Sequence, residues 1–199
     1  MGPLLLRVHP KSVLLRLGYW RSFRERRPLD AAGQPLPWWT YGCIDFLAER
    51  IRPDFRVLEF GCGYSTLWFS SRVKEVVSFE TDAKWAKITN DQTGLHVTVL
   101  PIVSLAEISE KLRQQHGQFQ IGIVDADIDR MECVRLTVKA LSNDGVIIWD
   151  NTDWVEWPEI KKLMRESGFR EISFTGIAPQ EIHLSRTTIF YRDNNCLDI

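Results

Sequence analysis

The chain has 199 residues, of which 44% are hydrophobic and 26% are charged, and its formal net charge is −1 at pH 7. This length and composition are typical of one globular domain with a substantial core, and they exclude a largely disordered chain. A net charge near zero argues against a general nucleic-acid binder, and the sequence has no run of 18 apolar residues that would span a bilayer.

The first 27 residues form a basic segment. Leu14, Leu15 and Leu17 predict an amphipathic helix there, which suits a solvated helix packed on the domain, a membrane surface or a partner protein. Residues 28–37 form a turn-rich connector, so we divide the chain into an N-terminal helix and connector (1–37) and a ligand-binding domain (38–199). The basic residues of the segment, set against the single acid Glu25, are Arg7, Lys11, Arg16, Arg21, Arg24, Arg26 and Arg27.

The rest of the chain alternates between helices and strands. We expect helices over residues 42–51, 83–91, 104–116, 130–141 and 158–166, with another beginning at Ser65. Strands are expected over residues 56–59, 75–80, 96–100, 119–125 and 145–150, followed by two closing strands over 170–174 and 187–191. This alternation predicts an α/β fold with a doubly wound, mostly parallel sheet, whose ligands bind beyond the carboxyl ends of the strands.

A glycine turn follows the first strand, in the sequence RVLEFGCGYS over residues 56–65. Gly61 and Gly63 permit a tight turn and a close approach of a ligand to the backbone, and Glu59 precedes them. Thr66 stands where the dinucleotide motif G-x-G-x-x-G has its third glycine, which argues against a dehydrogenase. A plain strand-to-helix turn without a ligand is the alternative interpretation.

A second acid ends the next strand. Glu80 lies 21 residues after Glu59, where a carboxylate is placed to accept protons from both hydroxyls of a ribose. Its negative charge would repel a 2′-phosphate, which argues against NADP. Asp82 is expected to cap the helix that follows.

The pattern E-x-G-x-G over residues 59–63 resembles motif I of the class I S-adenosylmethionine (SAM)-dependent methyltransferases. The order of elements over residues 38–192 resembles that family too, including a C-terminal antiparallel hairpin in a seven-stranded Rossmann-like sheet. The resemblance implies a SAM-binding domain over residues 38–199. It further implies these cofactor-binding residues: Glu59, Gly61, Gly63, Tyr64, Ser65, Glu80 and Asp125.

Acidic and amide side chains end the fourth and fifth strands, at Asp125 and at Asp150 with Asn151. Such oxygens suit Mg²⁺ or Ca²⁺. The arrangement resembles the catechol O-methyltransferase-type enzymes, which implies that these three residues bind Mg²⁺ and that Asp125 and Asp150 are catalytic. Alternatively, Asp125 contacts the cofactor or substrate, while Asp150 and Asn151 only stabilise a turn.

One position departs from that family, because Ile128 stands where its lysine base is expected. Deprotonation would then depend on the metal, on Asp125 or Asp127, or on His183 in a C-terminal loop. Tryptophans add a further pattern that fits either a lid and substrate mouth or ordinary packing. Trp38 and Trp39 precede the first helix of the domain, and three more cluster around the fifth strand: Trp149, Trp154 and Trp157.

The four cysteines, Cys43, Cys62, Cys133 and Cys196, form no C-x-x-C pair, which fits free thiols in a reducing compartment and a cytoplasmic location. Together these patterns predict a SAM-dependent methyltransferase that acts on a small-molecule acceptor at oxygen, without nucleic acid. Alternatives are a metal-independent enzyme that methylates nitrogen, a glycan or a lipid-linked acceptor, and a subunit that binds SAM without turnover.

Overall fold

The computed structural model describes residues 12–102, 104–125, 128–153 and 158–199. Its centre is a seven-stranded sheet with the order β3-β2-β1-β4-β5-β7-β6. Strands β3, β2, β1, β4 and β5 are parallel, whereas β7 is antiparallel to both β5 and β6. The strands are β1 (Arg56–Phe60), β2 (Glu75–Glu80), β3 (Val97–Pro101), β4 (Phe119–Val124), β5 (Leu141–Trp149), β6 (Arg170–Gly176) and β7 (Ser185–Tyr191). This sheet confirms the predicted architecture.

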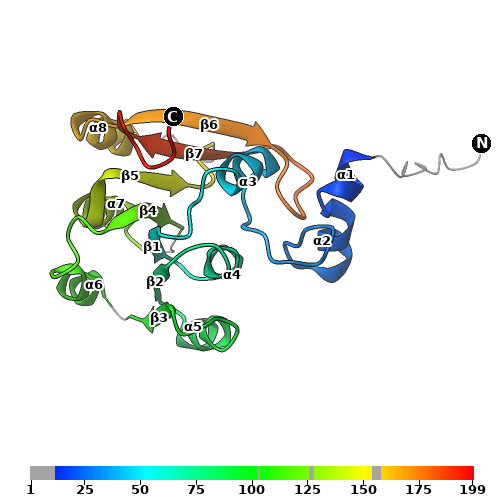
Figure 1. Cartoon of the computed structure of the whole chain (residues 1–199), viewed down its shortest axis with the longest axis horizontal. Helices are drawn as coiled ribbons and strands as arrows, with labels where there is room; N and C mark the ends of the chain where they lie inside the picture. The colour runs from blue at the N-terminus through cyan, green and yellow to red at the C-terminus, as the bar shows by residue number, and fades with distance from the viewer. Residues whose placement is uncertain (1–11, 103, 126–127, 154–157) are drawn as a thin grey trace, which may run out of the picture.

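Helices cover both faces of the sheet, with α3, α4 and α5 on one side and α6, α7 and α8 on the other (Figure 1). They are α3 (Tyr41–Ala48), α4 (Tyr64–Ser70), α5 (Ala83–Asn90), α6 (Leu105–Leu112), α7 (Arg130–Ala140) and α8 (Pro158–Glu166). No helix in the described part of the chain has the length and apolar character needed to cross a bilayer.

Alternate residues of β1 face opposite layers, which explains the two cores. Val57 belongs to the core under α3, α4 and α5, whereas Leu58 and Phe60 belong to the core under α6, α7 and α8. Glu59 therefore points to the same side as Val57, toward α4. This alternation places a carboxylate directly beneath the helix that follows the glycine turn.

The N-terminal segment forms two short helices, α1 (Val13–Arg16) and α2 (Tyr19–Glu25), where the sequence predicted one. Gly18 separates them with a φ of 78°, a conformation that favours glycine. A Cβ at this position would also lie 2.2 Å from the backbone carbon of Asp30. The helix therefore breaks where the connector passes close to it.

Strand β5 begins four residues earlier than expected. Leu141 pairs with Phe119 in β4, and the ladder shifts register between Phe119 and Ile121. The polar residues 142–144 resemble a loop in the sequence, yet they extend the strand because α7 leads directly into it. By contrast, β2 and α8 have the predicted bounds.

Candidate functional site

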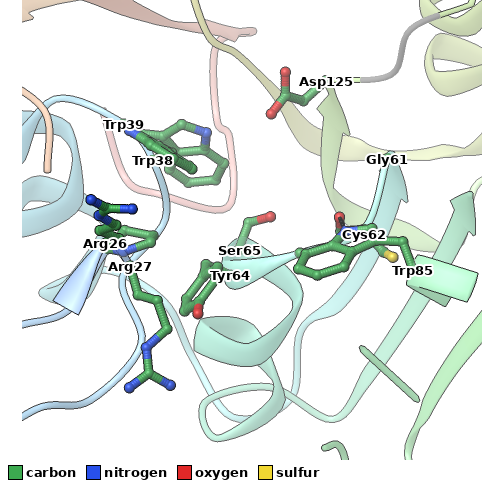
Figure 2. Close-up of a pocket in the computed structure, with 12 residues that line it drawn as sticks. Arg26, Arg27, Trp38, Trp39, Gly61, Cys62, Tyr64, Ser65, Trp85 and Asp125 are labelled. Carbon is green, nitrogen blue, oxygen red and sulfur yellow. Dashed lines mark hydrogen bonds between the residues drawn. The ribbon is translucent and has the colours of Figure 1, made fainter. Parts of the chain in front are cut away.

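A cavity of about 480 Å³ lies beside the β1–α4 turn, at the carboxyl edge of the parallel strands (Figure 2). Five separate segments of the chain meet there, which is the arrangement expected of a ligand site in an open α/β sheet. Its lining residues are Arg26, Arg27 and Pro28, then Trp38 and Trp39, then residues 61–65 of the turn, then Trp85 and Asp125.

Backbone geometry explains the two glycines of the turn. Gly61 has a φ of 87°, and its N–H donates to the carbonyl oxygen of Phe79 at 2.8 Å, which ties the turn to β2. Gly63 has an extended φ of 167°, and its N–H donates to the hydroxyl of Thr66 at 2.9 Å. Gly61 is therefore needed for conformation, whereas Gly63 leaves open the space beside the Trp85 ring, 3.8 Å from where a Cβ would lie.

Glu59 lies beneath the turn and is fully buried, so it does not line the cavity. Its carboxylate accepts hydrogen bonds from the hydroxyls of Ser65, Thr66 and Ser78, the last at 3.0 Å. Burial raises the pKa of Glu59 to about 7, although the three hydroxyls act in the opposite direction. The structure thus places Glu59 where it fixes the start of α4, with Ser65 between it and the cavity.

Glu80 joins the glycine turn to the turn that follows β2. One carboxylate oxygen accepts from the N–H of Cys62 at 2.9 Å, and the other accepts from the N–H of Asp82 at 2.9 Å. Glu80 is not among the lining residues, but Cys62 is. Asp82 caps α5 as predicted, because its side chain accepts from the N–H groups of Lys84 and Trp85.

Trp85 is a site residue that was not predicted from the sequence. Its indole N–H donates to the carbonyl oxygen of Cys62 at 2.7 Å, so the ring lies against the glycine turn, and Figure 2 shows it across the cavity from Trp38. Its place in the first turn of the helix after Glu80 puts it near the glycine turn, but nothing in the local sequence shows that the ring contacts that turn. Arg26 and Arg27 were also missed as lining residues, because they lie far from the turn in sequence.

Asp125 is the carboxylate that lines the cavity, directly after β4. Partial burial of the carboxyl group raises the pKa of Asp125 to about 6. Arg130 lies 3.7 Å away and acts in the opposite direction. The Asp125 side chain is 44% exposed because the cavity is open to water, which screens these charges in part. Asp125 also raises the pKa of Glu59 and of Asp150, so these acids lie close enough to repel one another.

Asp150 follows β5 but does not line the cavity, and it is only 5% exposed. The Thr187 hydroxyl donates to one of its carboxylate oxygens at 2.6 Å. Burial raises the pKa of Asp150 to about 7. Asn151, next in sequence, has a left-handed φ of 58°, as a residue at a sharp strand-end turn does.

The expected Mg²⁺ ligands do not fit a metal site in this arrangement. Asp150 is enclosed and engaged by Thr187, so that Asp125 is the one carboxylate of the pair that faces the cavity. Among the residues that the structure describes, no three His, Cys, Asp or Glu side chains gather as a metal-binding group. The described carboxylates do not converge on one point as a shared metal site requires, so we assign no chemical step to a metal.

Other residues singled out in the sequence lie elsewhere. Trp149 is buried in the core under α6, α7 and α8, which agrees with ordinary packing and not with the substrate mouth, the other interpretation of the tryptophans. His183 is on the loop between β6 and β7, 3.7 Å from Glu181, and it does not line the cavity. Ile128 packs against the core. Arg7, Lys11, Asp127, Trp154 and Trp157 lie outside the described residues.

No protein-family model and no curated protein matches this chain. Solved structures do match it. An O-methyltransferase from Bacillus cereus in complex with SAH is 18% identical, with a TM-score of 0.62 over 81% of this chain and 86% of that chain. An rRNA methylase from Streptococcus thermophilus is 12% identical, with a TM-score of 0.57 over 74% and 92% of the two chains.

A spermidine synthase from Thermotoga maritima is also similar in structure. It is 15% identical, with a TM-score of 0.53 over 74% of this chain and 57% of that chain. At these identities the comparisons establish the fold, and they confirm the expected Rossmann-like sheet of the class I methyltransferases. The acceptors named for these proteins differ, so the fold by itself does not identify an acceptor.

Proposed function

We propose that this chain is a SAM-dependent methyltransferase that binds SAM in the cavity and methylates a small-molecule acceptor at an oxygen atom. The observation that carries the proposal is the cavity itself, which joins the glycine turn after β1 to Asp125 after β4 in a sheet of this order. The SAH complex of the similar Bacillus cereus enzyme supports SAM as the cofactor. Residues 38–199 form the SAM-binding domain in this proposal, and residues 1–37 are appended to it.

The carboxylates around the Asp125 end of the cavity favour a cationic group there, whereas Arg26 and Arg27 line another part of its wall. Asp125 lines the cavity, while Glu59, Glu80 and Asp150 lie close behind its walls, and three of these carboxyl groups have raised pKa values. A sulfonium ion placed among them would stabilise their ionised forms. The rings of Trp38 and Trp85 provide faces that attract a cation or a planar base.

The chemistry asks for alignment and for removal of one proton. The methyl carbon passes from the sulfonium sulfur to the acceptor oxygen, the sulfur keeps the electron pair of the broken bond, and the hydroxyl proton goes to a base. Asp125 is the titratable side chain lining the cavity that has a pKa near 6, so it is ionised at pH 7 and able to accept that proton. Asp150 does not contact the substrate in this scheme, because it is buried and accepts a hydrogen bond from the Thr187 hydroxyl. Its role is to hold the end of β5 in position beside the cavity.

A second candidate is a subunit that binds SAM without turnover. Ile128 favours it, because this partly buried residue packs against the core at the position where the catechol O-methyltransferase-type enzymes, which the segment resembles, are expected to carry a lysine base. The four free cysteines are compatible with a reducing compartment, and a cytoplasmic location is part of both proposals. Methyl transfer to any acceptor separates the two candidates.

We expect isothermal titration calorimetry to show binding of SAM and of its demethylated product, and no binding of NAD. The reason is that the cavity lies beside two glycines and an acid but lacks the third glycine of a dinucleotide site. A preference for NAD would overturn the proposal.

Gly63→Leu tests whether SAM binds in this cavity. The extended backbone of Gly63 accepts a side chain, and the nearest atoms to a Cβ are those of Trp85 at 3.8 Å, so the fold should be kept. The leucine would occupy the space over the turn, and SAM affinity should fall about tenfold or more. Unchanged affinity would show that SAM binds elsewhere.

EDTA is expected to leave SAM binding and methyl transfer unchanged, because the described residues offer no set of metal ligands. The measurement compares turnover before and after dialysis against EDTA, with added Mg²⁺ as the control. Loss of turnover that Mg²⁺ restores would contradict this expectation and would assign Asp125 and Asn151 as ligands.

A further inference from the structure

Exposed large apolar side chains occur on α1, on α2 and on the neighbouring loop between β6 and β7. We call this surface the docking face, and its apolar members, between 38% and 83% exposed, are Val13, Leu15, Trp20, Phe23, Ile182 and Leu184. The Tyr19 hydroxyl donates to the carbonyl oxygen of Glu181 at 2.8 Å, which holds α2 against the loop, and Figure 1 shows these elements side by side. Exposed apolar groups that collect in one region mark an interaction site.

Inner contacts hold α1 and α2 on the domain, and the Trp20 and Phe23 rings contact the Tyr19 ring from outside. Leu14 and Leu17 pack against the core, and Tyr19 and Ser22 are buried. The Ser22 hydroxyl donates to the carbonyl oxygen of Leu29 at 2.7 Å and accepts from its N–H at 2.9 Å. Since these inner contacts fix α1 and α2, the outward apolar side chains are free to contact another surface.

Arginines are interspersed with the apolar residues in the sequence of α1 and α2. Residues 12–27 contain five arginines and one acid, Glu25, which pairs with Arg21, Arg24 and Arg27. Within the described ranges, neither Arg16 nor Arg26 has an ion pair. Residues 28–199 have the opposite balance, with 18 Lys and Arg against 25 Asp and Glu. An anionic surface would therefore attract the docking face and repel the rest of the molecule.

We propose that the docking face binds a membrane surface that contains anionic lipids. Trp20 and Phe23 would enter the boundary between headgroups and acyl chains, and Arg16 and Arg24 would contact lipid phosphates. Aromatic and aliphatic side chains interleaved with arginines are the composition that such a surface selects. The opposite charge of the remaining chain fixes the orientation.

This orientation has a consequence for the acceptor, and that consequence rests on the proposed function. Arg26 and Arg27 follow α2 directly, and both line the cavity. Figure 2 shows Arg26 and Arg27 beside Trp38 and Tyr64, on the side of the cavity away from Cys62 and Trp85. A membrane held by α2 would lie next to the cavity, so the small-molecule acceptor would be one that the lipid layer holds.

The test is sedimentation of the full chain with vesicles, without SAM. We expect binding to vesicles of mixed phosphatidylglycerol and phosphatidylcholine, weaker binding at high salt, and little binding to phosphatidylcholine alone. Trp20→Ser with Phe23→Ser, and separately Arg16→Glu with Arg24→Glu, should each reduce partitioning about tenfold or more. All four side chains are exposed. Because the Trp20 and Phe23 rings also contact the Tyr19 ring, thermal unfolding is measured to confirm that each variant is folded at the assay temperature.

Leu95→Ser and Arg113→Glu are the matched controls, because both side chains are exposed and lie outside the docking face. They should leave partitioning unchanged. Absence of binding to the mixed vesicles, or equal losses in the controls, would overturn the proposal. A further result would also overturn it: the protein does not bind vesicles, forms a dimer, and loses the dimer in Trp20→Ser. The docking face would then join two copies of the chain. Vesicle binding by a protein that fails to bind SAM would refute the proposed function and leave the docking face intact.

Discussion

Glu80→Ala is expected to weaken SAM binding by about 100-fold or more. The Glu80 carboxylate accepts from the N–H of Cys62 and from the N–H of Asp82, each at 2.9 Å. Hydrogen bonds to a charged group contribute about 1.5–3 kcal/mol each, and a carboxylate has further lone pairs for the two ribose hydroxyls. Alanine removes the tether of the cavity-lining turn, together with the ribose contact that the sequence predicts for Glu80. Calorimetric titration with SAM measures the loss.

Two variants separate the roles of Glu80. Glu80→Gln keeps one acceptor oxygen but loses the charge, so its affinity should lie between those of the wild type and the alanine variant. Glu159→Ala removes an exposed acid from α8, on the opposite side of the sheet, and should bind SAM as the wild type does. If Glu80→Ala binds SAM normally, the assignment of Glu80 to the ribose is wrong.

The sequence predicted the sheet because each parallel strand has its own apolar run and its own following helix. It also placed acids at the ends of β1, β2, β4 and β5, since parallel strands end at one edge. What the sequence did not predict is how deeply each of these acids is buried. Glu59 and Asp150 are buried and hydrogen-bonded to hydroxyls, whereas Asp125 faces the cavity. Those partners lie on other elements, and only packing decides which acid remains accessible.

Thr66 departs from the dinucleotide motif, and the structure shows what its hydroxyl does. In sequence it is the missing third glycine of a dinucleotide site. In the structure its hydroxyl donates to Glu59 and accepts from the N–H of Gly63, so that it links the buried acid to the turn. A glycine would lack that hydroxyl. Trp85 is the converse case, because nothing in its local sequence shows that its indole reaches the carbonyl oxygen of Cys62.

Glu59→Ala is expected to lower the free energy of unfolding by about 2–4 kcal/mol and to abolish measurable SAM binding. Thr66 and Ser78 are fully buried, so without the carboxylate their hydroxyls lose their acceptor in a place that water does not reach. The start of α4 would lose its anchor together with Ser65, which lines the cavity. Urea denaturation followed by circular dichroism measures the change.

Glu59→Gln keeps the shape and most of the hydrogen bonds but removes the titration, so it isolates the effect of charge. Burial raises the pKa of Glu59 to about 7, whereas the pKa of an unfolded glutamate is about 4.3. Between these values the folded protein holds a proton that the unfolded chain has released, so this group makes the wild type less stable as pH rises toward 7. Below the unfolded value, the stability associated with the protonated form is fully present.

The free energy of unfolding of Glu59→Gln, relative to the wild type, should therefore increase between about pH 5 and about pH 8. Asp150 also has a pKa raised to about 7, and its titration has the same sign, but it is present in both proteins and cancels in the difference. A difference that stays constant across this range would mean that Glu59 is already ionised at pH 5. The carboxylate would then be stabilised by its three hydroxyls more strongly than burial destabilises it, and the anchor of the turn would be a permanent anion.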